Sequence, residues 1–268
     1  MPTRERSVAA DRAYSQSSDK VFQILECVAS NPFPVRLQDI STQTNLSQST
    51  VLRYLNALLL ANYVYQEADT SRYALTWKIC KLGQGLNSDL SLRSIASPFV
   101  NQLAARLEMG SCLVVNQDYQ CVYLDCIDSP DTYMRTLRRI GRNAPLHATG
   151  SGKVLLASCS DSAIDDYIAT KGLIQLTEHT ITDRDMLFED ISKIRERGFG
   201  IDDEECELGL RCLSVPLRCY SGKVCAALSV FGNSAEYSTE VLSNEIHPIL
   251  CEIADTISLR LGYAPEKS

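Results

Sequence analysis

Residues 46–77 read "LSQSTVLRYLNALLLANYVYQEADTSRYALTW", and this stretch decides the fold of the N-terminal part of the chain. Ser47 is a candidate helix N-cap, because its hydroxyl can accept a hydrogen bond from a free backbone N–H. Apolar residues then recur every three or four positions, which predicts a helix with a wide buried face. They are Val51, Leu52, Leu55, Leu58 and Leu59. The following segment alternates around "EADTS" (67–71), which predicts two short strands and a turn.

Two shorter helices are expected upstream of this stretch. Segment 19–29 has one apolar face, with Ser18 and Asp19 as candidate caps, and "NPFP" (31–34) ends it. Segment 36–44 is a second short helix, with Asn45 as a candidate stop. The inward residues are Val21, Ile24, Leu25 and Val28 in the first helix, and Leu37 and Ile40 in the second. Three short helices and a hairpin predict a winged helix-turn-helix over residues 18–78, after a flexible tail over residues 1–17.

The polar face of the third helix is suited to DNA. Its first turn carries small hydroxyl and amide groups that can bond to base edges and phosphates in a major groove. Arg53 can bind a phosphate or a guanine, and Arg72 at the hairpin tip can reach the DNA backbone or the minor groove. The predicted DNA contacts are Ser47, Gln48, Ser49, Thr50, Arg53, Tyr54 and Arg72. An ordinary solvated face is the alternative, but the helix lengths, the turn and the hairpin all agree with DNA binding.

The net charge of −7 does not exclude this interpretation. Residues 1–90 carry 9 Lys/Arg and 8 Asp/Glu, whereas residues 91–268 carry 17 and 25, so the acidity belongs to the C-terminal part. The N-terminus is polar and lacks the apolar core of a secretion signal, and no apolar run reaches the roughly 18 residues of a membrane span. Eleven cysteines without a CxxC pair then predict free, mostly buried thiols in a reducing cytoplasm, with no metal site or cofactor.

A second domain is expected after a linker helix. Segment 77–107 looks helical with a break near Gly83–Ser88, so we place the linker at 79–91 and the second domain at 92–263. Strands are predicted at 111–116, 121–127, 210–217 and 224–231, with a further strand at "TYMRTLRRIG" (132–141). Helices are predicted at 150–158, 161–170 and 183–197, the last capped by Thr182. A long amphipathic helix closes the chain, with Leu242, Ile246, Ile249, Ile253, Ile257 and Leu261 on one face. This α+β pattern indicates a sheet flanked by helices, similar to a GAF-like sensor domain.

The segment "HATGSGKV" (147–154) resembles a phosphate loop but fails its pattern. His147 stands where the first glycine is needed, and Val154 stands where Ser or Thr must follow the lysine. A smaller prediction remains: a helix that begins at Gly150 and Ser151 offers free N–H groups to an anion. We expect His147 to be a satisfied core or turn residue. Of the four arginines in "MRTLRRIGR" (134–142), one or two are candidates to hold a carboxylate, and the rest are expected at a solvated edge.

The acidic segment "GIDDEECELGLRC" (200–212) allows three interpretations: a metal site, an acid/base pair, or a pocket wall. Neighbours in a strand alternate between faces, so four consecutive carboxylates cannot share one ion. No nucleophile elbow or Cys–His arrangement accompanies them. The pocket wall is favoured, with one carboxylate pointing inward and the others facing water.

Three stretches together resemble the IclR family of bacterial transcriptional regulators. They are 46–76, "GRNAPLHATGSGKVLLA" (141–157) and "RGFGIDDEECELGLRCLSVPLRCYSGKVCAALSVFG" (197–232), and the resemblance extends over about residues 18–262. It implies a cytoplasmic, non-enzymatic regulator that binds palindromic operator DNA as a homodimer or a dimer of dimers. Members of the family respond to small metabolites, often carboxylates. We therefore expect operator binding to be controlled by a carboxylate or sugar-acid-like effector.

The resemblance also implies which residues contact the effector. Tyr133, Gly150, Ser151, Asp202, Cys212 and Ser229 match effector-contacting positions of the family. Phe231 departs from the pattern, because a small polar residue is usual there, and an inward Phe231 would make the pocket smaller or more apolar. Two other function classes stay open: a hydrolase fused to a DNA-binding head, which lacks a nucleophile motif, and a redox-responsive regulator. The second would use Cys206, Cys212, Cys219 or Cys225.

Overall fold

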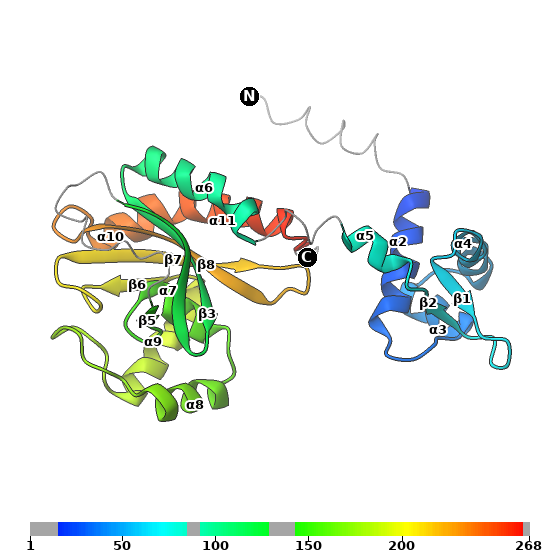
Figure 1. Cartoon of the computed structure of the whole chain (residues 1–268), viewed down its shortest axis with the longest axis horizontal. Coiled ribbons are helices and arrows are strands. Elements are labelled where there is room, and N and C mark those ends of the chain that lie inside the picture. Colours follow the sequence, from blue (N-terminus) through cyan, green and yellow to red (C-terminus); the bar gives the residue numbers. More distant parts are fainter. Residues whose placement is uncertain (1–15, 85–91, 129–142, 265–268) are drawn as a thin grey trace. The chain divides into compact units, whose positions relative to one another are not determined.

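The computed structural model describes residues 16–84, 92–128 and 143–264. The chain divides into two compact units, Met1–Asp89 and Leu90–Ser268 (Figure 1). Within the described ranges, no helix combines the length and the apolar character that a membrane span requires. The α+β fold class predicted from the sequence is confirmed, with helix-turn-helix and sheet-plus-helix units in the expected order.

The first unit is the predicted winged helix-turn-helix. It contains α2 (Gln16–Ser30), α3 (Leu37–Thr44), α4 (Gln48–Leu60), β1 (Val64–Gln66), β2 (Tyr73–Leu75) and α5 (Ile79–Gln84). Asn45 ends α3 in the left-handed conformation, with φ of 55°, as expected from its short polar side chain. Ser47 caps α4 by accepting a hydrogen bond from the backbone N–H of Thr50. β1 and β2 pair antiparallel and form the wing.

Two details of this unit differ from the sequence prediction. Leu52 is 40% exposed, because the buried stripe of α4 is narrower than expected and consists of Val51, Leu55 and Leu58. Ser18 and Asp19 lie inside the first turn of α2 and do not precede it, because this helix already includes Gln16.

The second unit is built on one six-stranded antiparallel sheet. Its strands are β3 (Gly110–Gln117), β4 (Gln120–Ile127), β5 (Asn143–Pro145), β6 (Gly200–Asp203), β7 (Leu210–Arg218) and β8 (Val224–Asn233). The order across the sheet is β5-β4-β3-β8-β7-β6. The hairpins β3–β4 and β7–β8 therefore meet at the β3–β8 pair in the centre of the sheet.

Helices cover both faces of this sheet (Figure 1). On one face α6 (Leu92–Leu107) and α11 (His247–Arg260) pack against residues such as Leu213, Leu228 and Val230. On the other face α7 (Gly150–Ala157), α8 (Asp161–Lys171) and α9 (Arg184–Arg197) pack against residues such as Cys212 and Phe231. Neighbours along a strand face opposite sides, so one strand supplies both cores.

Two corrections and one prediction without a structural test concern the second unit. The N-cap of α9 is Asp183, not Thr182; its carboxylate accepts from the N–H groups of Asp185 and Met186 at 2.9 and 3.0 Å. Strand β6 lies in a segment for which no strand was assigned. The strand predicted at 132–141 and the four arginines of 134–142 lie outside the described residues.

The closing helix is interrupted. It begins as α10 (Thr239–Val241), widens into the π-helical segment η2 (Leu242–Ile246) and continues as α11. The N–H of His247 bonds to the carbonyl of Leu242, five residues back. Pro248 follows and has no N–H to donate, so regular helix bonding cannot run through this point.

Candidate functional site

The predicted DNA-contacting side chains lie on the outer face of α4. Ser47, Gln48, Ser49 and Arg53 are exposed, and Thr50 is half-buried. The Ser47 hydroxyl lies 2.8 Å from that of Thr50 and 3.1 Å from that of Ser49, so these hydroxyls form one cluster at the helix start. A helix start with free N–H groups and clustered hydroxyls is suited to a phosphate.

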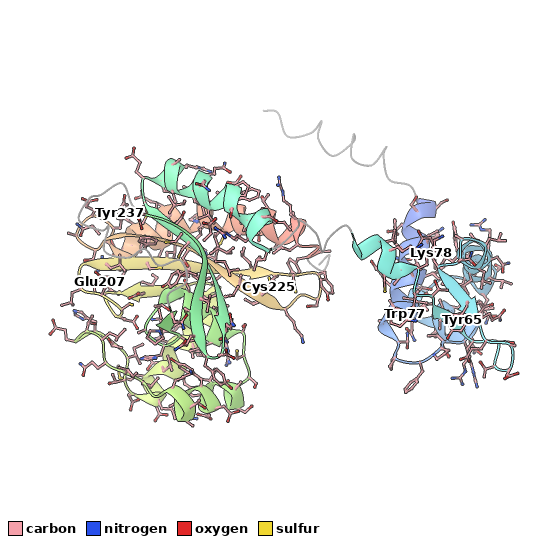
Figure 2. All side chains as sticks on the ribbon, viewed as in Figure 1. Tyr65, Trp77, Lys78, Glu207, Cys225 and Tyr237 are labelled. Atoms are coloured by element: carbon pink, nitrogen blue, oxygen red, sulfur yellow. The ribbon has the colours of Figure 1, made fainter. Side chains whose placement is uncertain are left out.

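Two of the predicted DNA contacts, Tyr54 and Arg72, are less exposed than the sequence indicated, because both side chains are half-buried. The hydroxyl of Tyr54 accepts a hydrogen bond from Arg53 at 3.1 Å, and a side-chain hydrogen bond with Ser17 lowers the pKa of Tyr54. Arg72 is half-buried where β2 begins, just after the wing turn. Tyr65, by contrast, is exposed on β1 (Figure 2).

In the second unit, the structure brings together most of the predicted effector residues where α7 begins above the sheet. Thr149 caps α7 by accepting from the N–H of Gly152 at 3.1 Å. The hydroxyl of Ser151 lies 2.6 Å from that of Ser229 on β8, which lies 2.7 Å from that of Ser214 on β7. All three serines are buried. Ser214 was missed by the sequence analysis, although its position two residues after Cys212 places it on the same face of the strand.

Helix α7 lies very close to its neighbours. A Cβ atom at Gly152 would lie 2.3 Å from the carbonyl oxygen of Leu146, and one at Gly150 would lie 2.9 Å from the Ser214 hydroxyl. Only glycine allows such a backbone approach. The first turn of the helix is therefore held directly over β6 and β7.

Asp202 on β6 points into the same face of the sheet and is 2% exposed. Its Oδ1 accepts from the N–H groups of Glu205 and Cys206 at 2.8 and 3.3 Å, so the carboxylate also holds the turn that follows β6. Burial first, and then the charge of Glu205, raise the pKa of Asp202 to about 7, while Lys153 opposes them.

The prediction that the other acids face water is wrong for Glu205, which is 5% exposed. Its Oε1 lies 2.5 Å from Nζ of Lys153, and the same ammonium lies 2.7 Å from Oδ2 of Asp190 on α9. Lys153 itself is 2% exposed. The sequence offered one signal that was not used: Lys153 stands within the apolar run of "GSGKVLLA", and a buried lysine requires counter-charges.

Phe231 points inward, on the same face of β8 as Ser229, and is 4% exposed. Its ring occupies the space above Gly110 on β3, where a Cβ atom would lie 2.2 Å from the ring. Cys212 is its cross-strand neighbour on β7 and is also buried. The surface formed by Phe231 and Cys212 is therefore apolar, as expected for a Phe231 that points inward.

A cleft of about 690 Å³ is lined by Ile201 and Asp203, the chain neighbours of Asp202, but by none of the six described effector candidates. Its wall contains Lys153, Asp190 and Glu205 together with side chains from α9, β6, α10 and η2. Tyr133, the seventh effector candidate, lies outside the described residues.

His147 is a satisfied core residue, as predicted. Its Nδ1 lies 2.6 Å from the Tyr167 hydroxyl and its Nε2 lies 3.0 Å from the carbonyl of Ile174. Within the described ranges, no three His, Cys, Asp or Glu side chains are placed to hold a metal ion.

The thiols named for redox sensing differ in environment. Cys212 is buried. Burial raises the pKa of Cys225, which is labelled in Figure 2, to about 11 and so disfavours the reactive thiolate. A hydrogen bond with Ser221 lowers the pKa of Cys219. The structure places no disulfide among the cysteines of the described residues.

The chain is similar to known regulators over most of its length. Residues 17–68 match the IclR helix-turn-helix domain, and residues 84–259 match the bacterial transcriptional regulator IclR C-terminal domain. The HTH-type transcriptional regulator KdgR of Escherichia coli (strain K12) is 32% identical over 244 residues, which cover 91% of this chain and 92% of KdgR.

Solved structures agree with this match. The Thermotoga maritima IclR structure is 28% identical with a TM-score of 0.61, covering 93% of this chain and 100% of that one. A double mutant of the PobR inducer-binding domain from Acinetobacter, in complex with 3-hydroxybenzoic acid, is 27% identical with a TM-score of 0.58. It covers 63% of this chain and 98% of that chain.

The raised pKa of Asp202 makes a prediction about stability. In the unfolded chain the carboxyl ionises near pH 4, and in the folded protein near pH 7, so the folded state binds more protons between these values. The contribution of Asp202 to the free energy of unfolding therefore decreases as pH rises from 4 to 7, and is constant above. Asp202→Asn keeps the Oδ1 acceptor but has no carboxyl to ionise, so its free energy of unfolding does not decrease in this way. The decrease amounts to a few kcal/mol, because each pKa unit corresponds to about 1.4 kcal/mol.

Urea unfolding of both proteins at pH 5, 6, 7 and 8 measures the difference. The variant should gain stability relative to the wild type up to pH 7 and then hold that gain. A difference that is the same at every pH would contradict the shifted ionisation of Asp202.

Proposed function

The chain belongs to the IclR family of bacterial transcriptional regulators, and we propose that it binds a pseudo-palindromic operator as a homodimer under the control of a small carboxylate effector. The observation that carries the effector part of the proposal is the arrangement at the start of α7. The first-turn N–H groups of Gly150 and Ser151, two serine hydroxyls and one buried carboxylate converge there from three elements of the second unit.

The DNA part rests on α4 and the wing. The hydroxyl cluster at Ser47 and the exposed Arg53 lie on one face, opposite the buried Val51, Leu55 and Leu58. In a helix-turn-helix the second helix of the motif enters the major groove by its N-terminal residues. In this chain that helix is α4, so in the proposed complex Gln48, Ser49 and Arg53 read bases and Arg72 contacts the phosphate backbone.

The effector chemistry follows from what each wall offers. The start of α7 attracts an anion, because its N–H groups and the helix dipole favour negative charge. Asp202 repels an anion and accepts a hydrogen bond from a hydroxyl. Phe231 favours an apolar body between these two ends. A hydroxylated carboxylic acid with an apolar or aromatic body meets the three requirements, and the hydroxybenzoate bound to the PobR domain belongs to that class.

Control of DNA binding requires differential affinity. An effector shifts the protein between two arrangements only if it binds them with different strength, and the DNA then changes effector affinity by the same factor. Exposed Leu60, Trp77 and Leu82 on the first unit offer apolar surface to the second copy of a dimer. Trp77 is 90% exposed and is labelled in Figure 2.

We expect Arg53→Ala to weaken operator binding about tenfold or more, because one charge-assisted contact contributes about 1–3 kcal/mol. An electrophoretic mobility-shift assay at fixed salt measures the change in affinity. The DNA in this assay is a fragment that the protein protects in vivo. Arg36→Ala, an exposed arginine just before α3, is the matched control and should change affinity little. Equal affinity of the Arg53→Ala variant and the wild type would exclude α4 as the reading helix.

Asp202→Ala should abolish the response to effector while leaving operator binding without effector unchanged. Isothermal titration with 3-hydroxybenzoate and mobility shift on operator DNA measure the two properties separately. Alanine also removes the acceptor that holds the turn after β6, so Asp202→Asn serves as the control that keeps this turn. Full effector affinity in both variants would place the effector elsewhere.

Phe231→Ser should change which effector is preferred. The serine restores a small polar residue, so affinity for pyruvate should rise relative to 3-hydroxybenzoate, by about tenfold or more in the ratio of the two dissociation constants. Phe231→Leu is the control, because it reduces volume and keeps the wall apolar. A ratio that moves equally in both variants would show that volume, and not polarity, sets the preference.

A further inference from the structure

Lys153 is the most deeply buried cation in the described part of the second unit, and it lies outside the predicted effector contacts. It bridges Glu205 at 2.5 Å and Asp190 at 2.7 Å, so one ammonium joins α7, α9 and the turn after β6. Lysine is almost never fully buried unless it is paired. The burial of Lys153 next to the proposed effector residues therefore needs an explanation other than a general contribution to the stability of the fold.

The first link leads from Lys153 to Asp202. Glu205 uses its side chain to bind Lys153, and its backbone N–H donates to Oδ1 of Asp202 at 2.8 Å. The carbonyl of Glu205 accepts from the hydroxyl of Thr180 at 2.6 Å. The N–H and the carbonyl of Glu205 thus both fix the turn that holds Asp202, and Lys153 fixes the side chain of Glu205.

The second link leads to the start of α7. Lys153 lies one helical turn after Thr149, and its N–H donates to the carbonyl of Thr149 at 2.9 Å. The same short helix presents Ser151 to the proposed effector site. Lys153 therefore connects the two halves of that site, the anion-binding helix start and the acceptor carboxylate.

The third observation is the balance of charge. Three buried or half-buried carboxylates, Asp190, Asp202 and Glu205, share this region with the buried ammonium of Lys153 and the partly exposed guanidinium of Arg197, whose Nη2 lies 3.9 Å from Oδ1 of Asp190. The groups that face Asp202 are Glu205 and Cys206 on its own turn, Lys153 on α7 and the thiol of Cys212, its register partner on β7. Glu205 disfavours the ionised form of Asp202 and Lys153 favours it. Asp190, on α9, pairs with the same ammonium.

We propose that Lys153 is a positioning residue for effector recognition: through its ion pair with Glu205 it fixes the turn that presents Asp202, and its ammonium supplies the buried positive charge that this cluster of carboxylates requires. Its consequence for effector affinity rests on the proposed function, whereas its effect on Asp202 does not. A lysine with only a structural role would stabilise the fold without any specific effect on the titration of Asp202.

The decisive experiment measures the ionisation of Asp202 directly. The full-length protein is labelled with ¹³C at the aspartate carboxyl carbons, and the resonance of Asp202 is assigned by its absence in Asp202→Asn. Its chemical shift is then followed from pH 4 to pH 9. No effector is needed, so the outcome does not depend on whether the effector site is correctly assigned.

Two variants that both lack the Lys153–Glu205 ion pair distinguish the effect of the Lys153 charge from the effect of losing that contact. Glu205→Gln removes a negative charge and should lower the titration midpoint of Asp202. Adding Lys153→Met to that variant removes the cation and should raise the midpoint again, by about one pH unit. Identical midpoints in E205Q and in the double variant K153M/E205Q would overturn the proposal.

Milder variants test the proposal should the double variant not fold. Lys153→Arg keeps the charge and should keep the Asp202 midpoint near that of the wild type. Asp190→Asn loses a partner of the same ammonium but keeps its charge, so stability should fall while the midpoint does not rise. A rise in either variant would show that Asp202 responds to disruption in general and not to the cation.

The effector readout follows from the same logic. In Lys153→Arg, the pH dependence of 3-hydroxybenzoate binding should follow the measured Asp202 midpoint, as in the wild type. Failure of the wild type to bind this probe would count against the proposed effector class, while the titration of Asp202 would still decide the role of Lys153.

Discussion

The close approach of α7 to its surroundings is the constraint on which the second unit depends. Gly152 lies against the backbone of Leu146 at a distance that no Cβ atom would allow. This contact places the whole of α7 inside the core, so that its lysine is buried together with its leucines. A buried ammonium is tolerated only with counter-charges, which Asp190 and Glu205 supply from two other elements. The position of α7 thus determines where acidic residues must be buried.

The same arrangement explains why polar and apolar groups share one face of the sheet. Ser214 and Ser229 face the start of α7 and bond to one another, which satisfies buried hydroxyls that no water reaches. Phe231, two residues further along β8, meets Gly110 and not a helix terminus, so an aromatic ring fits there. Polarity along β8 therefore follows from what lies opposite each residue. A ligand at this site would meet hydroxyls at one end and a ring at the other.

Much of the architecture could be predicted from the sequence. The helices of the first unit, the αL stop at Asn45 and the cap at Ser47 depend on residues a few positions apart, and local patterns record such interactions well. The strands β7 and β8 were predicted for the same reason, because alternation is local. Strand β6 was not, since its four residues contain two acids and become a strand only by pairing with β7. The π segment of the last helix also escaped prediction, although Pro248 marks its position.

The sequence by itself determined the fold class and the family, because periodicity and short motifs are properties of consecutive residues. The inward direction of Asp202 was implied only by the resemblance to that family. Only the tertiary structure decided that Glu205 is buried and that Ser214 joins Ser151 and Ser229. It alone also identified Lys153 as the link between α7 and the Asp202 turn. Lys153 and Glu205 are separated by 52 positions. Their pairing, like that of Ser151 and Ser229, exists only where α7 is packed on the sheet, and electrostatic need across such distances leaves no local pattern.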